Sequence, residues 1–324
     1  MGLIHELPLA PDGKSGWPWT HESQDFSELN DDGQDWPRIS IITPSYNQGR
    51  FLEETIRSVL LQNYPNLEYI VMDGGSTDQS IEIIKRYEGW IDYWVSEDDG
   101  GQSKAINMGV QRASGKIVNW TNSDDCLVEG ALRRVANGCR TSPEAVAWVG
   151  ACNFTHEDGE IYQVAAPVVG TKSAFANWGG PDSDPSRSAW VGQPSCFFLR
   201  SAFLQVGGLN PDLHFTMDVE LWMKLIERGN FCVLDSTISS ARVYPGIKTK
   251  QDYPARMAEH VVVNWLLDEK PQSRVKMVEF GERYSRERIL SMGFAELSGY
   301  LAIWIYRKLL KDPFVGFKAM LKLK

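Results

Sequence analysis

The chain has 324 residues, enough for one large α/β core with appendages. Its composition, with 43% hydrophobic and 23% charged residues, is ordinary for a globular protein and excludes a wholly disordered chain. The net charge of −9 argues against a general nucleic-acid-binding protein, so we expect no nucleic-acid partner.

Residues 1–36 show no hydrophobic period and predict an irregular extension, which is acidic because it has eight acidic residues and one lysine. From residue 38 onward, short apolar runs typical of buried parallel strands alternate with stretches of helical spacing. The predicted strands cover 38–43, 67–72, 93–96 and 116–120, and the predicted helices cover 51–62, 79–87 and 103–113. This alternation predicts an α/β fold with a mainly parallel, Rossmann-like sheet and helices on both faces.

The second half of the chain has a less regular pattern. Its predicted elements are strands at 147–153, 161–164 and 193–199, a loop at 171–188 and an amphipathic helix at 218–227. From residue 275 the sequence is helical in pattern and partly cationic, with nine basic and four acidic residues in 281–324. We therefore expect a helical tail after the α/β core.

Polar residues follow each of the first four predicted strands. Ligands of such sheets bind beyond the carboxyl ends of the strands, so these residues should meet in one crevice. The candidate binding residues at this edge are Pro44, Tyr46, Asp73, Asp99, Lys104, Asp124 and Asp125.

The adjacent acids Asp124 and Asp125 follow the fourth strand. Buried paired carboxylates are costly unless a cation neutralises them, and Mg²⁺ or Mn²⁺ is usually held by one or two carboxylates together with phosphates of the substrate. The alternative is a pair of helix-capping aspartates. The other polar residues at this edge favour a metal site.

Tyr46, Asp73 and Lys104 each allow two interpretations. The ring of Tyr46 suits stacking on a nucleobase, but a packed surface tyrosine is the simpler alternative. The Asp73 carboxylate suits a base N–H or a ribose hydroxyl, or else it is part of an ordinary turn. Lys104 is either a phosphate ligand at a helix N-terminus or a solvated lysine.

Asp218 and Glu220 begin the amphipathic helix predicted at 218–227. A carboxylate at this place either caps the helix or acts as a general base that deprotonates an acceptor hydroxyl. The sequence around Asp218 alone does not decide between these roles.

Six motifs in this order resemble the family 2 glycosyltransferases, which have the GT-A fold and mostly invert the anomeric centre. The likeness covers residues 37–249. The motifs occupy 40–47, 73–78, 97–109, 122–125, 207–210 and 217–222.

The resemblance assigns roles to the candidate residues. It implies that Tyr46 and Asp73 hold the nucleobase. It further implies that Asp124 and Asp125 fill the DxD position, which binds Mn²⁺ or Mg²⁺ and the sugar nucleotide, and that Asp218 is the catalytic base. Pro44, Asp99 and Lys104 complete the expected donor site.

The chain departs from the family pattern at three places. The DxD motif begins with Asn122 rather than Asp, and Gly74 stands where a second aspartate is usual. Many relatives have a histidine late in the domain, whereas residues 241–249 contain none. The metal or phosphate contact of that histidine is expected to be either absent or made by Arg242, Tyr244 or Lys248.

The expected reaction is an inverting transfer from a nucleoside diphosphate sugar, with UDP favoured, to a glycan or lipid-linked acceptor. This chemistry suits bacterial-type polysaccharide, lipopolysaccharide or glycolipid assembly. Gln193, Trp190 and Trp178 are acceptor-side candidates. A sugar-1-phosphate nucleotidyltransferase and a non-catalytic sugar-nucleotide-binding protein are the alternatives, and the first should have a Gly-rich, basic loop that residues 44–50 lack.

The sequence predicts three regions: an extension at 1–36, a GT-A domain at 37–250 and a helical region at 251–324. The domain divides at residue 125 into a nucleotide-binding half and an acceptor half. The tail at 294–324 interleaves apolar and basic residues, which suits a helix lying on an anionic membrane surface. A helix packed on the domain or on a second subunit of a homodimer is the alternative.

The cellular location is expected from cysteines and hydropathy. Five cysteines form no CxxC pair, which favours a reduced, cytoplasmic protein. No signal peptide is recognisable at the start, and the longest uncharged apolar stretch near the end, residues 297–306, is shorter than the roughly 20 residues of a spanning helix. We expect a cytoplasmic protein, with the inner face of the plasma membrane as a site of contact.

Overall fold

The computed structural model describes residues 2–27, 33–178, 187–248 and 253–283. The chain divides into two units, one made of Met1–Pro211 with Met217–Ile247 and the other of Asp212–Thr216 with Lys248–Lys324. The predicted membrane-surface helix at 294–324 lies outside the described residues. Among the helices that the structure describes, none is long and apolar enough to cross a membrane.

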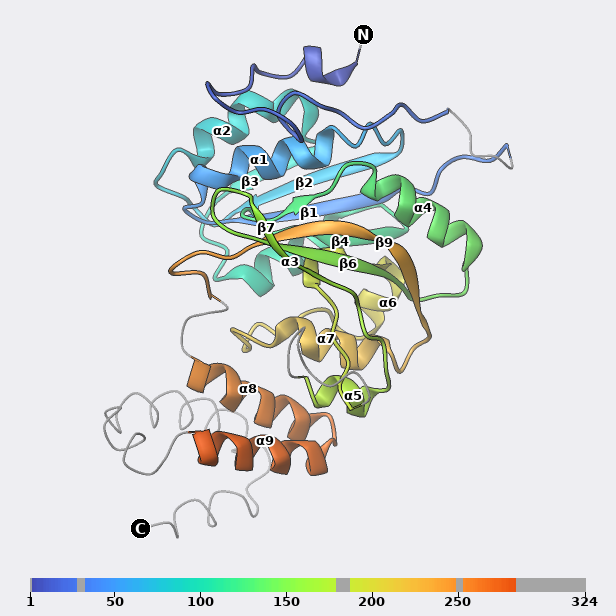
Figure 1. Ribbon diagram of the computed structural model, residues 1–324, viewed down its shortest axis with the longest axis vertical. Coiled ribbons are helices and arrows are strands. Elements are labelled where there is room, and N and C mark those ends of the chain that lie inside the picture. Colours follow the sequence, from blue (N-terminus) through green and yellow to red (C-terminus); the bar gives the residue numbers. More distant parts are fainter. Residues whose placement is uncertain (1, 28–32, 179–186, 249–252, 284–324) are drawn as a thin grey trace. The chain divides into compact units, whose positions relative to one another are not determined.

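A nine-stranded sheet forms the centre of the first unit (Figure 1). Its first half has the order β3-β2-β1-β4 with every neighbouring pair parallel. These strands are β1 (Ile39–Ser45), β2 (Leu67–Asp73), β3 (Tyr93–Ser96) and β4 (Ile117–Trp120). The predicted parallel α/β half is therefore confirmed, and each strand lies within one or two residues of its predicted bounds.

The second half of the sheet is mixed. It continues in the order β4-β8-β6-β9-β5, and β7 pairs with β6. The pair β6–β9 is parallel, whereas β4–β8, β8–β6, β9–β5 and β6–β7 are antiparallel. These strands are β5 (Cys126–Leu127), β6 (Ala147–Thr155), β7 (Ile161–Ala165), β8 (Cys196–Leu199) and β9 (Phe231–Arg242).

Helices cover both faces of the sheet, as the sequence predicted (Figure 1). One face carries α1 (Gly49–Leu60), α2 (Ser80–Tyr87) and α4 (Ala131–Thr141), and the other carries α3 (Gln102–Arg112), α6 (Arg200–Gln205) and α7 (Met217–Leu225). The short helix α5 (Lys172–Ala176) also belongs to this unit. After the edge strand β3 the chain returns across the sheet to β4, which lies on the far side of β1. Helix α3 makes this connection on the face opposite α1 and α2, as right-handed crossovers require.

The core explains why these segments form these elements. All seven residues of β1 are buried, as expected for a strand that helices cover on both faces. In α1, Leu52, Ile56 and Val59 recur at helical spacing and are completely buried against the sheet. Burying each such side chain contributes about 1.5–3 kcal/mol. The hydrophobic pattern of the sequence is thus sufficient to define these elements.

In its described residues, 2–27 and 33–36, the acidic extension is irregular apart from a 3-10 turn at Leu3–His5 and a bridge residue, Asp35. It nevertheless packs on the first unit. Arg57 of α1 is 1% exposed and donates hydrogen bonds to the backbone carbonyls of Pro8, Pro18 and Trp19. Its guanidinium also contacts the hydroxyl of Tyr87. The sequence predicted the irregular backbone but gave no indication of this anchoring arginine.

Several elements differ from the expectations of the sequence, which did not predict β5, α4 or α6. Helix α5 lies inside the stretch predicted as a loop, and residues Gln193–Ser195 form a 3-10 turn before β8. Strand β9 was not predicted, because its residues do not alternate strictly between buried and exposed, which is the pattern that marks a half-buried strand. Its twelve residues are held by pairing with β6 rather than by an apolar run.

The second unit contains α8 (Tyr253–Leu266) and α9 (Lys270–Arg283). Within this unit, the carboxylate of Glu259 accepts hydrogen bonds from the backbone N–H groups of His214, Phe215 and Thr216. These bonds fix residues 212–216 to α8. Burial raises the pKa of Glu259 although these hydrogen bonds act to lower it.

Candidate functional site

The carboxyl ends of β1, β2 and β3 meet at one edge of the sheet. Ser45 pairs with Asp73, and Asp73 pairs with Ser96. The segment after β4 begins at the same edge, since the N–H of Thr121 donates to the carbonyl of Ile42. The polar loops that follow these strands are therefore neighbours, as the fold predicted.

Tyr46 lies in the loop after β1 with 63% of its side chain exposed. The adjacent Asn47 has a φ of 51° and ties this loop to the loop after β2, because its side-chain oxygen accepts from the N–H of Thr77 at 2.8 Å and its own N–H donates to Ser76. Tyr46 is thus presented to solvent by an ordered loop, which suits stacking. Pro44 is buried within β1.

Asp73 is 1% exposed and its carboxylate accepts three hydrogen bonds. The hydroxyls of Ser76 and Ser96 each donate at 2.6 Å, and the N–H of Ser76 donates at 2.9 Å. The carboxylate therefore joins the loops after β2 and β3. A contact between the Asp73 carboxylate and a nucleobase remains a prediction. Asp73 would make that contact in addition to holding the two loops together.

The glycine-rich loop before α3 brings Asp99 beside the loop after β2. A Cβ atom at Gly74 would lie 3.1 Å from the Asp99 carboxylate, so the Asp99 side chain occupies the space that a larger residue at position 74 would need. Gly101 has a φ of 115° and donates its N–H to Asp99. Lys104 is exposed in the first turn of α3, next to Gly100.

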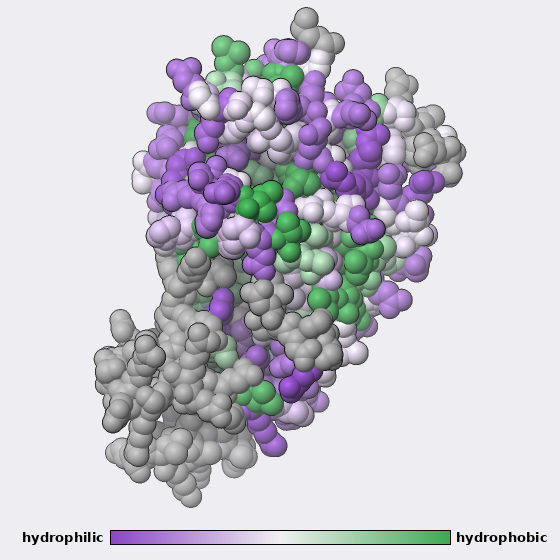
Figure 2. Space-filling model, viewed as in Figure 1, coloured by the Kyte–Doolittle hydropathy of each residue, from purple (hydrophilic) through white to green (hydrophobic). Residues whose placement is uncertain are grey.

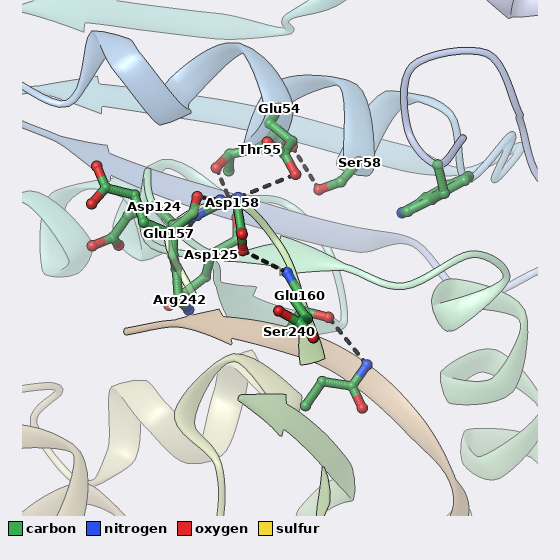
Figure 3. A network of polar contacts seen from close by, with 12 residues as sticks. Glu54, Thr55, Ser58, Asp124, Asp125, Glu157, Asp158, Glu160, Ser240 and Arg242 are labelled. Atoms are coloured by element: carbon green, nitrogen blue, oxygen red, sulfur yellow. Dashed lines mark hydrogen bonds and ion pairs between the residues drawn. The ribbon is translucent and has the colours of Figure 1, made fainter. Parts of the chain in front are cut away.

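The two adjacent acids point to different environments (Figure 3). Asp125 is 6% exposed, and its carboxylate accepts from Asn122 Nδ2 at 3.0 Å and from the N–H of Arg242 at 3.2 Å. Burial, together with the neighbouring Asp124, raises the pKa of Asp125. Asp124 is partly exposed and accepts from the hydroxyl of Tyr244 at 2.7 Å. Asp124 is therefore the more accessible of the two acids, and the buried Asp125 stabilises the loop 122–125 through Asn122 and Arg242.

Asn122 occupies the centre of a side-chain network. Its amide oxygen accepts from Gln102 Nε2 at 2.8 Å, and its amide nitrogen donates to Asp125 and, at 2.9 Å, to Gln193 Oε1. Gln193 in turn donates to the carbonyl of Trp120. The structure therefore brings the acceptor-side candidate Gln193 next to the acid pair.

Two of the residues expected to replace the absent late histidine, Arg242 and Tyr244, lie beside the acid pair. Arg242 is buried and is held by Glu54 at 3.1 Å and by backbone carbonyls of Asp124 and Glu157. Tyr244 reaches the Asp124 carboxylate itself, and its hydroxyl also accepts from Gln48 Nε2 at 3.0 Å. Burial and the negative charge of Asp124 raise the pKa of Tyr244 to about 12. Lys248 belongs to the second unit.

Arg50 brings positive charge to the rim of this network. Its side chain is 51% exposed and pairs with Glu157 at 2.7 Å. Its guanidinium carbon lies 4.6 Å from the centre of the Tyr244 ring and 4.3 Å from that of Phe51. Nothing in the sequence indicates the contact between Arg50 and Tyr244, because no spacing rule relates residue 50 to residue 244.

Asp218 is the second residue of α7 and is partly exposed. Its carboxylate accepts from the N–H of Val219 at 2.8 Å, as a residue in the first turn can. The preceding Met217 accepts from the hydroxyl of Ser103, which places the start of α7 beside the start of α3. Burial and, in addition, the negative charge of Asp218 raise the pKa of Cys196, so Asp218 lies near that thiol. Asp218 therefore lies at the same edge as the Gly-rich loop.

The donor atoms near Asp124 fit a divalent ion that is held mainly by a substrate. Among the residues that the structure describes, no group of three or more His, Cys, Asp or Glu forms a ready metal site. A single accessible carboxylate still suits Mg²⁺ or Mn²⁺, because these ions are commonly bound through one or two carboxylates and the phosphates of the substrate. The hard carboxylate oxygen atoms of Asp124 suit the same ions.

The comparisons with known proteins agree with this geometry. The model of the family "Glycosyl transferase family 2" matches residues 40–202. Glycosyltransferase GlyG of Streptococcus pneumoniae is 32% identical over 127 residues, which are 38% of this chain and 42% of GlyG. The putative teichuronic acid biosynthesis glycosyltransferase TuaG of Bacillus subtilis is 40% identical over 93 residues, 28% of this chain and 36% of TuaG. The matched parts thus span less than half of either relative.

Two solved structures have a similar fold. The TarS fragment 1–349 of S. aureus in complex with UDP has a TM-score of 0.54 at 21% identity, over 79% of this chain and 75% of that chain. The mannosyltransferase PcManGT of Pyrobaculum calidifontis, in complex with GDP-Man and Mn²⁺, has a TM-score of 0.52 at 18% identity, over 88% and 79%. The predicted GT-A type of α/β fold is confirmed.

Proposed function

The chain belongs to glycosyl transferase family 2. We propose on this basis that it is a glycosyltransferase, which transfers a sugar from a UDP-sugar to a hydroxyl of a glycan or lipid-linked acceptor, with inversion. UDP is favoured because the similar TarS fragment binds UDP and UDP-GlcNAc. The observation that carries the proposal is Asp124, a carboxylate held at the crevice edge by Tyr244 at 2.7 Å.

The donor end of the site is assigned to the loops after β1, β2 and β3. Tyr46 stacks on the base with its exposed ring, while Asp73 holds the loops in place and accepts from the base or the ribose. Lys104 and the first N–H groups of α3 attract the diphosphate. Asp99 keeps the loop before α3 against the loop after β2.

The leaving diphosphate needs positive charge as its bond to the sugar breaks. Asp124 would hold Mn²⁺ or Mg²⁺ together with the diphosphate, and such an ion supplies electrostatic stabilisation of the leaving group. Tyr244 orients the Asp124 carboxylate, and Arg50 stacks on the Tyr244 ring. Asp125 stays inside and keeps the loop 122–125 in shape through Asn122 and Arg242.

Asp218 is assigned the role of general base. A carboxylate at the start of α7 takes the proton of the acceptor hydroxyl while that oxygen attacks the anomeric carbon from the face opposite the diphosphate. The bond to the diphosphate breaks in the same step, and the product has the inverted configuration. Gln193 and the tryptophans near it lie on the acceptor side.

A panel of nucleotide sugars tests the proposal most directly. The wild-type chain with Mn²⁺ should release free nucleotide from at least one UDP-sugar, and Asp124→Ala should abolish Mn²⁺-dependent binding of UDP measured by calorimetry. The control variant Asp12→Ala removes an exposed acid of the N-terminal extension, outside the assigned donor loops, and should leave UDP binding unchanged. A chain that binds UDP-sugars but releases no nucleotide, even with acceptors present, would be a non-catalytic binder.

Polysaccharide, lipopolysaccharide or glycolipid assembly in the cytoplasm, at the inner membrane face, is the proposed setting. The name of TuaG, which refers to teichuronic acid, supports a cell-envelope pathway. The tail 294–324 is proposed to bring the enzyme to the membrane or to a second subunit.

A further inference from the structure

A row of aromatic side chains runs along β6, β7 and the segment before β8. Its members are, in order, Trp178, Trp190, Phe154, Tyr162 and His156. The distances between successive ring centres are 6.1, 6.0, 6.3 and 4.7 Å. Each step is comparable to the size of a sugar ring. We call these five residues the aromatic row.

The row has a buried base and an accessible surface. Trp190 is 6% exposed and packs with Cys152 and Ala165, against which Phe154 and Trp178 are partly buried. Tyr162 is 46% exposed, and His156 is exposed beside it. Trp190 therefore serves as support, while Tyr162, His156 and part of Trp178 are accessible to a ligand.

Figure 2 shows apolar residues on the surface over β7. Ile161 and Val164 of this strand are 52% and 59% exposed, so β7 carries an unusual amount of apolar surface for an edge strand. A function in binding explains why such residues stand at the edge of the sheet.

Two members of the row, Trp190 and His156, are close in sequence to residues of the candidate active site. Three residues after Trp190, Gln193 donates to the carbonyl of Trp120 and accepts from Asn122. At one end of the row, His156 precedes Glu157, whose carbonyl accepts from Arg242 and whose carboxylate pairs with Arg50. A ligand lying on the row would thus have one end near Asp124.

Charge limits the chemistry of this ligand. The hairpin 151–165 contains the acids Glu157, Asp158 and Glu160 and no lysine or arginine. Glu157 pairs with Arg50, but Asp158 and Glu160 remain as negative charge at the turn, where Asp158 accepts the N–H of Glu160 (Figure 3). A polyanionic chain or an anionic headgroup would be repelled here.

We propose that the aromatic row is an extended acceptor site for an uncharged glycan chain, whose sugar rings stack on Tyr162, His156 and Trp178. The proposal rests on the proposed function, because the row leads to the transfer site. A glycan fits better than a lipid surface, since stacking uses ring faces in a line and the acidic turn disfavours anionic membranes.

Binding of defined oligosaccharides to the full chain tests the proposal. The probes are the neutral hexamers of maltose, cellulose and chitin type, with hexagalacturonate as the anionic comparison, and the measurements are saturation-transfer NMR and calorimetry. At least one neutral hexamer should bind at least ten times more tightly than hexagalacturonate. Tyr162→Ala should weaken that binding about 3- to 10-fold, as loss of one aromatic contact does, whereas Tyr162→Phe should retain it.

The double variant Asp158→Asn with Glu160→Gln provides a second arm. It should leave the binding of the neutral hexamer unchanged and improve that of hexagalacturonate. Binding of UDP, measured in the same samples, separates this proposal from the proposed function. If UDP binds but no neutral hexamer does, or if Tyr162→Ala binds like the wild type, the aromatic row is not an acceptor site. Tyr162-dependent hexamer binding without UDP binding would support the row and count against the proposed function.

Discussion

Replacing Tyr244 by phenylalanine tests the link between the crevice acid and its support. The change removes one oxygen atom, which donates to Asp124 at 2.7 Å and accepts from Gln48 at 3.0 Å. It keeps the ring, which lies 5.0 Å from that of Phe51 and under the Arg50 guanidinium. The variant should therefore fold normally and lose only the orientation of the Asp124 carboxylate.

The size of the effect follows from the type of hydrogen bond. A bond to a charged group contributes about 1.5–3 kcal/mol, so Tyr244→Phe should lower kcat/KM by about 10- to 150-fold. We expect weaker Mn²⁺-dependent binding of the donor as well, because Asp124 would adopt several orientations. The assay is nucleotide release at varied UDP-sugar and Mn²⁺ concentrations, with UDP affinity from calorimetry.

Tyr64→Phe is the matched control for this variant. The Tyr64 hydroxyl donates to the carbonyl of Pro37, at the end of β1 remote from Asp124, and the side chain is 5% exposed, as is that of Tyr244. It should cost similar stability and leave kcat/KM unchanged. If Tyr244→Phe has wild-type kcat/KM and metal dependence, then the Tyr244 hydroxyl has no part in catalysis and another residue takes the place of the late histidine.

Three further outcomes are expected. Asp218→Asn should lower kcat by about 10²- to 10⁴-fold and leave UDP affinity intact, and near-normal turnover would remove Asp218 as the base. Burial acts to raise the pKa of Glu68, but hydrogen bonds from Ser40 and Ser114 outweigh this effect and lower it. The ionised Glu68 therefore contributes stability that is present above its ordinary pKa and is lost as pH falls through the lowered value. The melting temperature of Glu68→Gln should accordingly vary less with pH below 4.5 than that of the wild type, and parallel curves would contradict this. Flotation with anionic liposomes should fall when residues 294–324 are removed, and equal flotation would refute membrane contact through this tail.

The sequence predicted the parallel half of the fold because its elements have simple patterns. Continuous apolar runs such as β1 and helical spacing such as that of Leu52, Ile56 and Val59 depend on local sequence alone. Strand β9 escaped prediction because pairing with β6 stabilises it, and this long-range contact leaves no period in the sequence.

The candidate site was predictable in position but less so in the division of roles. Strand ends mark where ligands bind, so Tyr46, Asp73 and Asp124 could be named from their places in the sequence. Which of two adjacent acids faces the crevice depends on the direction of each side chain. Only the structure shows that Asp125 turns inward to Arg242 while Asp124 meets Tyr244.

The inward position of Asp125 also explains why an asparagine begins the DxD-like motif. Asn122 donates to Asp125 and Gln193 and accepts from Gln102, so the site needs a side chain that both donates and accepts. An aspartate at this position would put a carboxylate against the buried Asp125 and remove the donor to Asp125 Oδ2, while the N–H of Arg242 still donates to Oδ1. Leaving that buried oxygen unsatisfied costs about 1–3 kcal/mol. Asn122 is therefore consistent with an active site in which a single acid, Asp124, faces the donor, and its presence does not imply that the metal-binding function has been lost.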